Sequence, residues 1–118
     1  MVYIKEAHPE GDGDAALIHN VKAGIHIEEA TTDLDRAITA KKMCSTLHTS
    51  LPCVVDSVDN HVNDVYAAWP ARIYLLSADG KVFYRSGPGP EGFKPAEARD
   101  ALERLLGVVT QVSSAAAR

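Results

Sequence analysis

The sequence predicts an α/β fold, in which helices flank a central β-sheet and the chain closes with a β-hairpin and a helix. The hairpin gives the clearest evidence, because strand-forming runs at 71–76 and 81–85 flank a turn with an Asp-Gly pair. Two helices with one apolar face each support the same fold class, one over 31–49 and one beginning at Pro95.

The first thirty residues predict a strand followed by a long loop. Residues 2–6 form a strand-like run that ends in Glu6, and His8 follows shortly after it. Residues 7–30 predict an irregular segment with a polar, glycine-containing tip and some helix around 15–21. A loop of this length in a compact domain is usually functional or disordered.

A helix, a strand and a second helix are expected next. Thr31 or Thr32 caps the first of these helices, which ends before a Leu-Pro pair because the residue before proline favours extended backbone. The apolar run 51–55 predicts a short buried strand. Asp59 caps the following helix, and Pro70 stops it.

Length and composition favour one soluble globular domain, which we assign to residues 1–112, with 113–118 as a flexible tail. A formal net charge of −4 without a basic cluster argues against a nucleic-acid partner. No apolar run approaches the roughly 18 residues that cross a membrane, and no signal peptide is recognisable. Since the two cysteines make no disulfide framework, we expect a cytoplasmic protein.

His8 and Glu6 are the first candidate site residues. An imidazole with a pKa of about 6.5 at the end of a strand can donate to an anion or exchange a proton. Glu6 would then fix the tautomer of His8 or stabilise its charged form. The alternative interpretation is a strand-end histidine that is hydrogen-bonded to backbone.

Cys53 is the plausible functional thiol, as a resolving or substitute group. The alternative is structural burial, because no neighbour in sequence would lower its pKa. Cys44 lies on the apolar face of its helix, where cysteine acts as a small hydrophobe. A disulfide between Cys44 and Cys53 is compatible with the sequence. The remaining histidines and acidic runs lack the spacing of zinc or calcium sites, so we predict no metal and no cofactor.

Most of residues 1–107 resembles the iodothyronine deiodinases, which are thioredoxin-fold selenoenzymes, and their bacterial relatives. The resemblance is carried by the order and spacing of five segments. The segments are Tyr3 to Pro9, Leu51 to Asn60, Tyr66 to Tyr74, Asp79 to Lys81 and Gly87 to Pro95. The resemblance implies a partial thioredoxin-like fold. It also places Pro70 at the position of the cis-proline that shapes the substrate cleft of that fold.

The chain departs from the family pattern at the residues that carry its chemistry. The family's first core strand, its Cys or selenocysteine loop and the following helix have no counterpart in these residues, and no Cys-x-x-Cys pair occurs. Ala30 or a neighbour stands at the family's second functional histidine. Pro88 falls where some animal members carry a carboxylate-binding arginine. These departures argue against reductive deiodination by this chain.

In the family sheet, the strand without a counterpart lies between the strands equivalent to 2–6 and 71–76. Those two strands could pair directly, another chain could supply the missing edge, or the sequence could be a truncated product. We expect a homodimer or small homo-oligomer that completes the sheet.

Two function classes follow. The favoured one is a module without redox activity that self-associates or binds a partner, with a small molecule as a further conceivable ligand. The alternative is a thiol-dependent oxidoreductase of the deiodinase and peroxiredoxin-like lineage, acting on a small substrate. In that enzyme His8 and Glu6 would line the cleft and Cys53 would be the thiol. A cysteine pKa well below about 8.5 would favour the enzyme.

Overall fold

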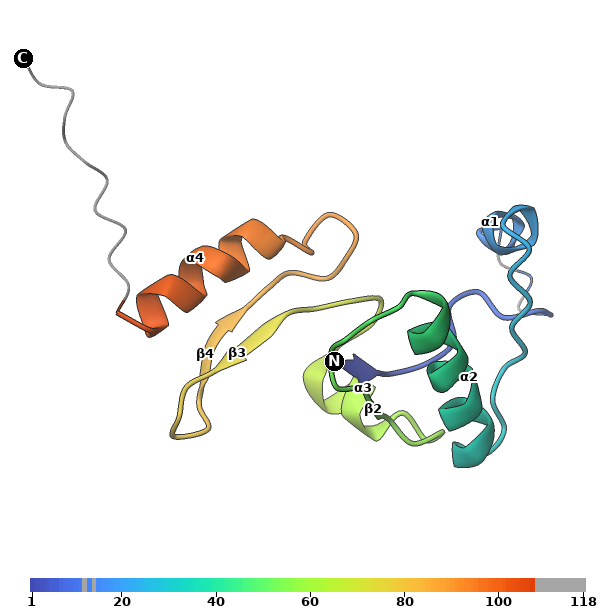
Figure 1. Cartoon of the computed structure of the whole chain (residues 1–118), viewed down its shortest axis with the longest axis horizontal. Coiled ribbons are helices and arrows are strands. Elements are labelled where there is room, and N and C mark those ends of the chain that lie inside the picture. Colours follow the sequence, from blue (N-terminus) through green and yellow to red (C-terminus); the bar gives the residue numbers. More distant parts are fainter. Residues whose placement is uncertain (12, 14, 108–118) are drawn as a thin grey trace, which may run out of the picture. The chain divides into compact units, whose positions relative to one another are not determined.

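The computed structural model describes residues 1–11, 13 and 15–107, which fall into two compact units, Met1–Ala68 and a second that begins at Trp69 (Figure 1). Helices and strands occur in both, as the α/β prediction requires. The predicted tail, 113–118, lies outside the described residues.

The first unit combines a short parallel sheet with three helices. Strands β1 and β2 pair with Val2 opposite Val54 and Tyr3 opposite Val55. The backbone N–H of Asp56 extends this pairing by donating to the carbonyl of Tyr3 at 2.8 Å. The elements of the unit are β1 (Val2–Tyr3), α1 (Leu17–Lys22), α2 (Asp33–Thr46), β2 (Val54–Val55) and α3 (His61–Tyr66).

Both strands of this unit are shorter than predicted. The strand expected over 2–6 ends at Tyr3, because the carbonyl of Ile4 accepts a hydrogen bond from a side chain instead of from a strand. The buried strand expected over 51–55 is wrong in length and in burial, since Val54 is 62% exposed. A buried strand needs neighbours on both edges and both faces, and the apolar run alone does not supply them.

Thr32 caps α2, so the structure chooses between the two threonines. Its hydroxyl oxygen accepts from the N–H of Asp35 at 3.1 Å, and the Asp35 carboxylate accepts from the N–H of Thr32 at 3.1 Å. The helix buries Arg36 and Ala40. The face predicted to be apolar carries Leu34, Ile38 and Cys44. It is not the fully buried face, since Leu34 is 69% and Ile38 59% exposed.

Helix α3 begins after Asn60 and ends sooner than expected. Asp59 still accepts from the N–H of His61 at 3.1 Å, as a capping residue would. The main anchor comes from further away, because Asp56 accepts from the first-turn N–H groups of Val62 and Asn63 at 3.0 and 2.8 Å. The helix stops at Tyr66 because the next residue is in the left-handed conformation, before the predicted stop at proline.

The second unit confirms the predicted hairpin and final helix. Strands β3 (Tyr74–Leu76) and β4 (Val82–Arg85) pair antiparallel. Helix α4 (Pro95–Leu105) begins with its proline, packs against both strands and buries Ala98 and Ala101.

The strands form two separate two-stranded sheets, β1 with β2 and β3 with β4. Direct pairing of β1 with β3, one of the three outcomes considered for the sheet, stays a prediction, because the two strands belong to different units. Among the described residues of the first unit, β1 has a strand partner on one edge alone.

Candidate functional site

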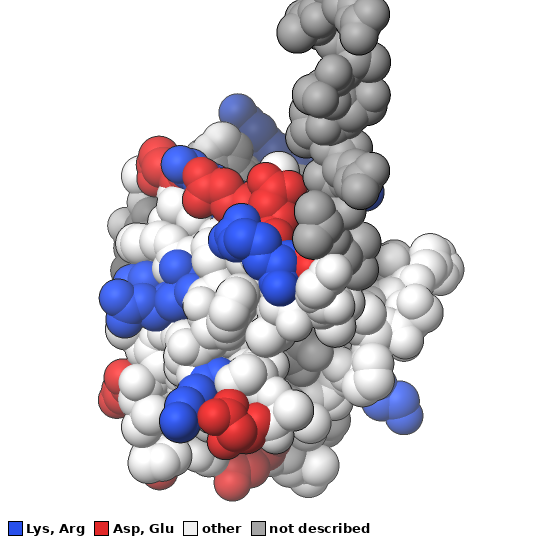
Figure 2. Space-filling view, turned by 90° about the vertical axis from the view of Figure 1, so that its left-hand side faces the viewer, with Lys and Arg blue, Asp and Glu red and all other residues white. Residues whose placement is uncertain are grey.

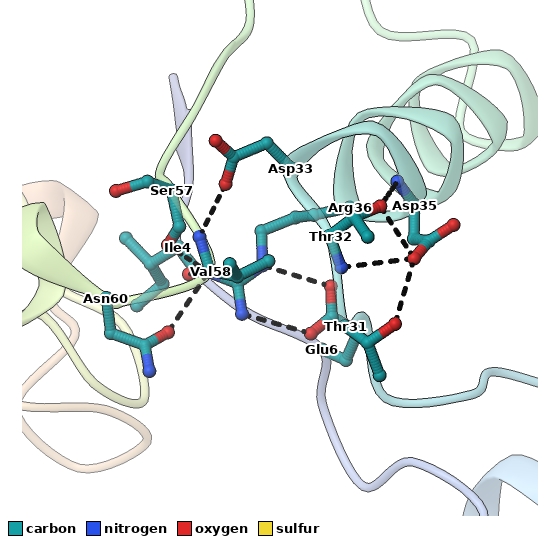
Figure 3. Close-up of polar contacts among 10 residues, drawn as sticks. All are labelled: Ile4, Glu6, Thr31, Thr32, Asp33, Asp35, Arg36, Ser57, Val58 and Asn60. Atoms are coloured by element: carbon teal, nitrogen blue, oxygen red, sulfur yellow. Dashed lines mark hydrogen bonds and ion pairs between the residues drawn. The ribbon is translucent and has the colours of Figure 1, made fainter.

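The centre of the first unit is a buried ion pair between Glu6 and Arg36 (Figure 3). Arg36 donates from Nε to Oε1 and from Nη2 to Oε2 of Glu6, each at 3.3 Å. The two side chains are only 2% and 3% exposed. A charge buried this deeply is tolerated because it is paired and hydrogen-bonded. The fork of the guanidinium matches both carboxylate oxygens, a geometry that lysine cannot provide.

The third guanidinium nitrogen of Arg36 connects α2 to the chain after β1 and to the loop before α3 (Figure 3). Its Nη1 donates to the carbonyl oxygens of Ile4 and Ser57 at 3.1 and 2.5 Å, and to Oδ1 of Asn60 at 3.0 Å. These acceptors follow β1 and precede α3. The network thus fixes the chain leaving β1 against α2 and the loop before α3.

His8 follows Glu6 by two positions, and a side chain from another segment holds its backbone conformation. Its φ is 53°, a left-handed value uncommon for a residue other than glycine. Nδ2 of Asn20, in α1, donates to the carbonyls of Ala7 and His8 at 2.9 and 3.1 Å. Strained backbone of this kind persists where the surroundings hold it, often at functional sites. The half-buried imidazole is thereby presented from a fixed loop.

The long segment 7–30 is accordingly ordered where the structure describes it. Besides α1, the N–H of Glu10 donates to the carbonyl of Ile27 at 2.8 Å, and the carboxylate of Glu10 pairs with His26 at 2.7 Å. The two ends of the segment lie side by side as a result. The expectation of an irregular stretch with some helix around 15–21 matches α1.

Glu6 and His8 have different surroundings. Both carboxylate oxygens of Glu6 accept from Arg36, so its role in the structure is to hold the end of β1. The predicted effect of Glu6 on the tautomer of His8 stays a prediction. Arg36 and Asp56 are the residues that the sequence analysis missed. The only signals for them were a lone arginine one helical turn before Ala40, and an aspartate directly after a strand.

Cys53, just before β2, is half-buried, and its Sγ lies 3.7 Å from the carbonyl oxygen of Val54. Burial, and then a hydrogen bond with the side chain of Cys44, raise the pKa of the Cys53 thiol. Burial also raises the pKa of nearby Tyr3 to about 12, with help from the charge of Glu6. A raised thiol pKa is the opposite of what a nucleophilic cysteine needs at neutral pH. Both cysteines are free thiols.

Pro70, the predicted cleft residue, belongs to the second unit, and the peptide bond between Trp69 and Pro70 is cis.

Among the described residues, no group of three or more histidine, cysteine, aspartate or glutamate side chains is arranged to hold a metal ion. None of the described helices is long and apolar enough to cross a membrane. On the face shown in Figure 2, basic and acidic side chains are interspersed.

Comparison with known proteins gives a consistent family. The model of the iodothyronine deiodinase family matches residues 1–106. Curated relatives include a type I iodothyronine deiodinase of Xenopus laevis, 36% identical over 104 residues, and a thyroxine 5-deiodinase of Aquarana catesbeiana, 37% identical over 106 residues. A thyroxine 5-deiodinase of Sparus aurata is 36% identical over 104 residues.

Each alignment covers 88% of this chain but only 36–38% of the relative, so the chain spans less than two-fifths of the length of these proteins. The three relatives are vertebrate, so they give no support to a bacterial type. No solved structure matches the chain significantly. The match of the family model over nearly the whole chain decides the assignment. The chain belongs to the iodothyronine deiodinase family.

Proposed function

We propose that this chain is a thioredoxin-fold, deiodinase-like module that acts by associating with a second copy of itself. We further propose that residues 1–118 do not by themselves carry out reductive deiodination. The observation that carries the proposal is the edge of β1. Within the described first unit, β1 pairs with β2 and with no strand on its other side. The names of the relatives describe deiodinases more than twice as long, and their activity is not transferred to this chain.

The thin apolar core of the described residues supports association. The buried apolar side chains of the described residues are small, with Pro9 and Ala40 in the first unit and Ala98 and Ala101 in the second. Large apolar side chains remain exposed in the first unit, where a partner could cover them. In the first unit the strongly exposed ones include Val2, Leu34, Ile38, Leu47, Leu51, Val54 and Val65.

A second copy is the partner that the geometry of β1 fits best. An unpaired strand edge presents N–H and C=O groups that are costly to leave without partners and that recruit another strand. Two copies of β1 can pair antiparallel across a twofold axis, which makes a closed dimer from one self-complementary surface. Val2, 45% exposed in β1, would then lie at the centre of the contact.

The thiol-dependent oxidoreductase remains the second candidate, because Cys44 lies beside Cys53. The raised pKa of Cys53 argues against it as the nucleophile. The binding of an anion or a small molecule by His8 stays a prediction in either case. We place the module in the cytoplasm, since a reducing compartment maintains free thiols.

Light scattering after size exclusion, at micromolar concentration, tests the proposal. We expect a mass of twice 12.7 kDa for the unchanged chain. Val2→Lys places a charge on the edge of β1 and should return the mass to that of one chain. Val21→Lys is the matched control, because this valine of α1 is 49% exposed against 45% for Val2, and it should leave the dimer intact. A wild-type mass of one chain, or a dimeric Val2→Lys variant, contradicts the proposal.

A further inference from the structure

Two free thiols lie on either side of the turn that connects α2 to β2. Cys44 lies in the last turns of α2, and Cys53 directly precedes β2. Helix α2 packs against β2, and the turn after the helix is closed by the N–H of Thr49, which donates to the carbonyl of Cys44 at 3.2 Å. The chain thus doubles back and brings residue 53 to the end of the helix that carries residue 44.

The packing of α2 on β2 brings the two thiols into the same neighbourhood, and Cys44 lies near enough to Cys53 to contribute to the raised pKa of the Cys53 thiol. Both are half-buried and free, so a small disulfide can reach them and neither is held in an existing bond. Cys53 is further positioned by β1, because Val54 donates its N–H to the carbonyl of Met1 at 3.0 Å. The pair therefore lies where α2, β1 and the start of β2 meet.

We propose that Cys44 and Cys53 form a reversible intramolecular disulfide by exchange with small-molecule disulfides, such as oxidised glutathione. One cysteine, as its thiolate, attacks a sulfur of the small disulfide and releases one small thiolate. The other cysteine attacks the mixed disulfide on the first, which forms the protein disulfide and releases the second small thiolate. The two protons of the protein thiols end on the two released thiols. The protein is oxidised by two electrons and the small disulfide is reduced by two.

The bond would connect the C-terminal part of α2 to the residue that leads into β2. It would make the packing of α2 on β2 covalent, at the place where β2 pairs with β1. Because burial and Cys44 raise the pKa of Cys53, exchange is slow at neutral pH and accelerates as the pH rises. The pair is therefore suited to respond to a sustained oxidising shift. This inference does not rest on self-association, since both thiols lie in one unit of one chain.

The test equilibrates the reduced, full-length chain with mixtures of reduced and oxidised glutathione, then identifies disulfides by mass after an acid quench. We expect an intramolecular bond between Cys44 and Cys53. The ratio of oxidised to reduced protein gives the effective concentration of one thiol at the other. In concentrated urea this should be in the millimolar range of a short flexible loop, and in the folded chain at least about tenfold higher.

Cys44→Ser and Cys53→Ser are matched controls, and each should stop at a mixed disulfide with glutathione. The comparison of folded and urea-unfolded wild type needs no variant, so a serine variant that fails to fold leaves the test intact. The inference is overturned if folding does not raise the effective concentration. It is equally overturned if the wild type accumulates mixed disulfides at both cysteines, or intermolecular disulfides that double the mass. A wild type that is monomeric by light scattering refutes self-association and leaves this test unaffected.

Discussion

Replacing Glu6 with glutamine removes one charge of a buried pair while keeping the size of the side chain. Arg36 would keep its three bonds from Nη1 to Ile4, Ser57 and Asn60 but would lose the carboxylate that balances its charge. Both side chains are almost completely buried, so water cannot take over the missing partner. Glu6→Gln should therefore cost much more than a surface substitution.

The loss of unfolding free energy in Glu6→Gln depends on the hydrogen bonds that Arg36 keeps. Removing one partner of a buried ion pair costs about 3–5 kcal/mol. The amide oxygen of glutamine still accepts one hydrogen bond from Arg36, so we expect the lower end, about 3 kcal/mol. Since native domains unfold with about 5–15 kcal/mol, this is a large part of the total. With a urea dependence of about 1.5 kcal/mol per molar, the midpoint should fall by about 2 M.

The assay is urea unfolding followed by far-UV circular dichroism, with the same protein concentration for each variant because association contributes to stability. Glu28→Gln, at an exposed glutamate, is the matched control and should change stability by less than about 0.5 kcal/mol. In a cycle with Arg36→Met, the double variant should cost about 1–3 kcal/mol less than the sum of the single changes. Additive changes, or a loss below about 1 kcal/mol for Glu6→Gln, would refute the structural role of the pair.

Four further predictions concern α2 and the residues near β1. Thr32→Ala removes the cap of α2 and should cost about 1 kcal/mol in urea unfolding, whereas an unchanged midpoint would refute the capping role. The hydrogen bond from Thr32 lowers the pKa of Asp35 below 3.8, so its stabilisation is complete above pH 3.8 and is lost as the pH falls through the lower folded value. The stability difference between wild type and Asp35→Asn should accordingly shrink below pH 3.8, and a difference that grows there would be contrary to this sign. Alkylation of Cys53 should rise with pH along a curve whose midpoint lies above 9.0, and Cys44→Ala should lower that midpoint. A midpoint well below about 8.5 would restore the enzyme interpretation. In an ultraviolet titration one tyrosinate should form only near pH 12, and Tyr3→Phe should abolish that step; an unchanged curve would mean that Tyr3 is not buried as described.

Local signals were sufficient for the elements that local chemistry determines. The hairpin turn and the proline at the start of α4 are encoded within a few residues, and both were found. The cap of α2 was narrowed to two adjacent threonines, and the structure selects Thr32 because Asp35 lies three residues beyond it. Such contacts span three or four residues, so the sequence order itself places the partners together.

The contacts that build the candidate site depend on distant residues. Glu6 and Arg36 are 30 positions apart, and nothing near either residue in sequence indicates the other. The periodicity of α2 showed which residues share a face, but not which face is buried. The face of Arg36 and Ala40 packs inward because Arg36 pairs there with the buried carboxylate of Glu6, whereas Leu34 is exposed. Patterns that predict burial from hydrophobicity alone fail at such a charged centre.

The neighbour of β1 on its open edge decides the central claim, which is that a second copy completes this sheet. Isotope-filtered NOE spectra of a mixture of labelled and unlabelled chains detect contacts between chains only. We predict backbone contacts from Val2 and Tyr3 of one chain to the same residues of the other, in an antiparallel pattern. Contacts of β1 to β2 alone, or pairing of β1 with β3 inside one chain, would contradict the account.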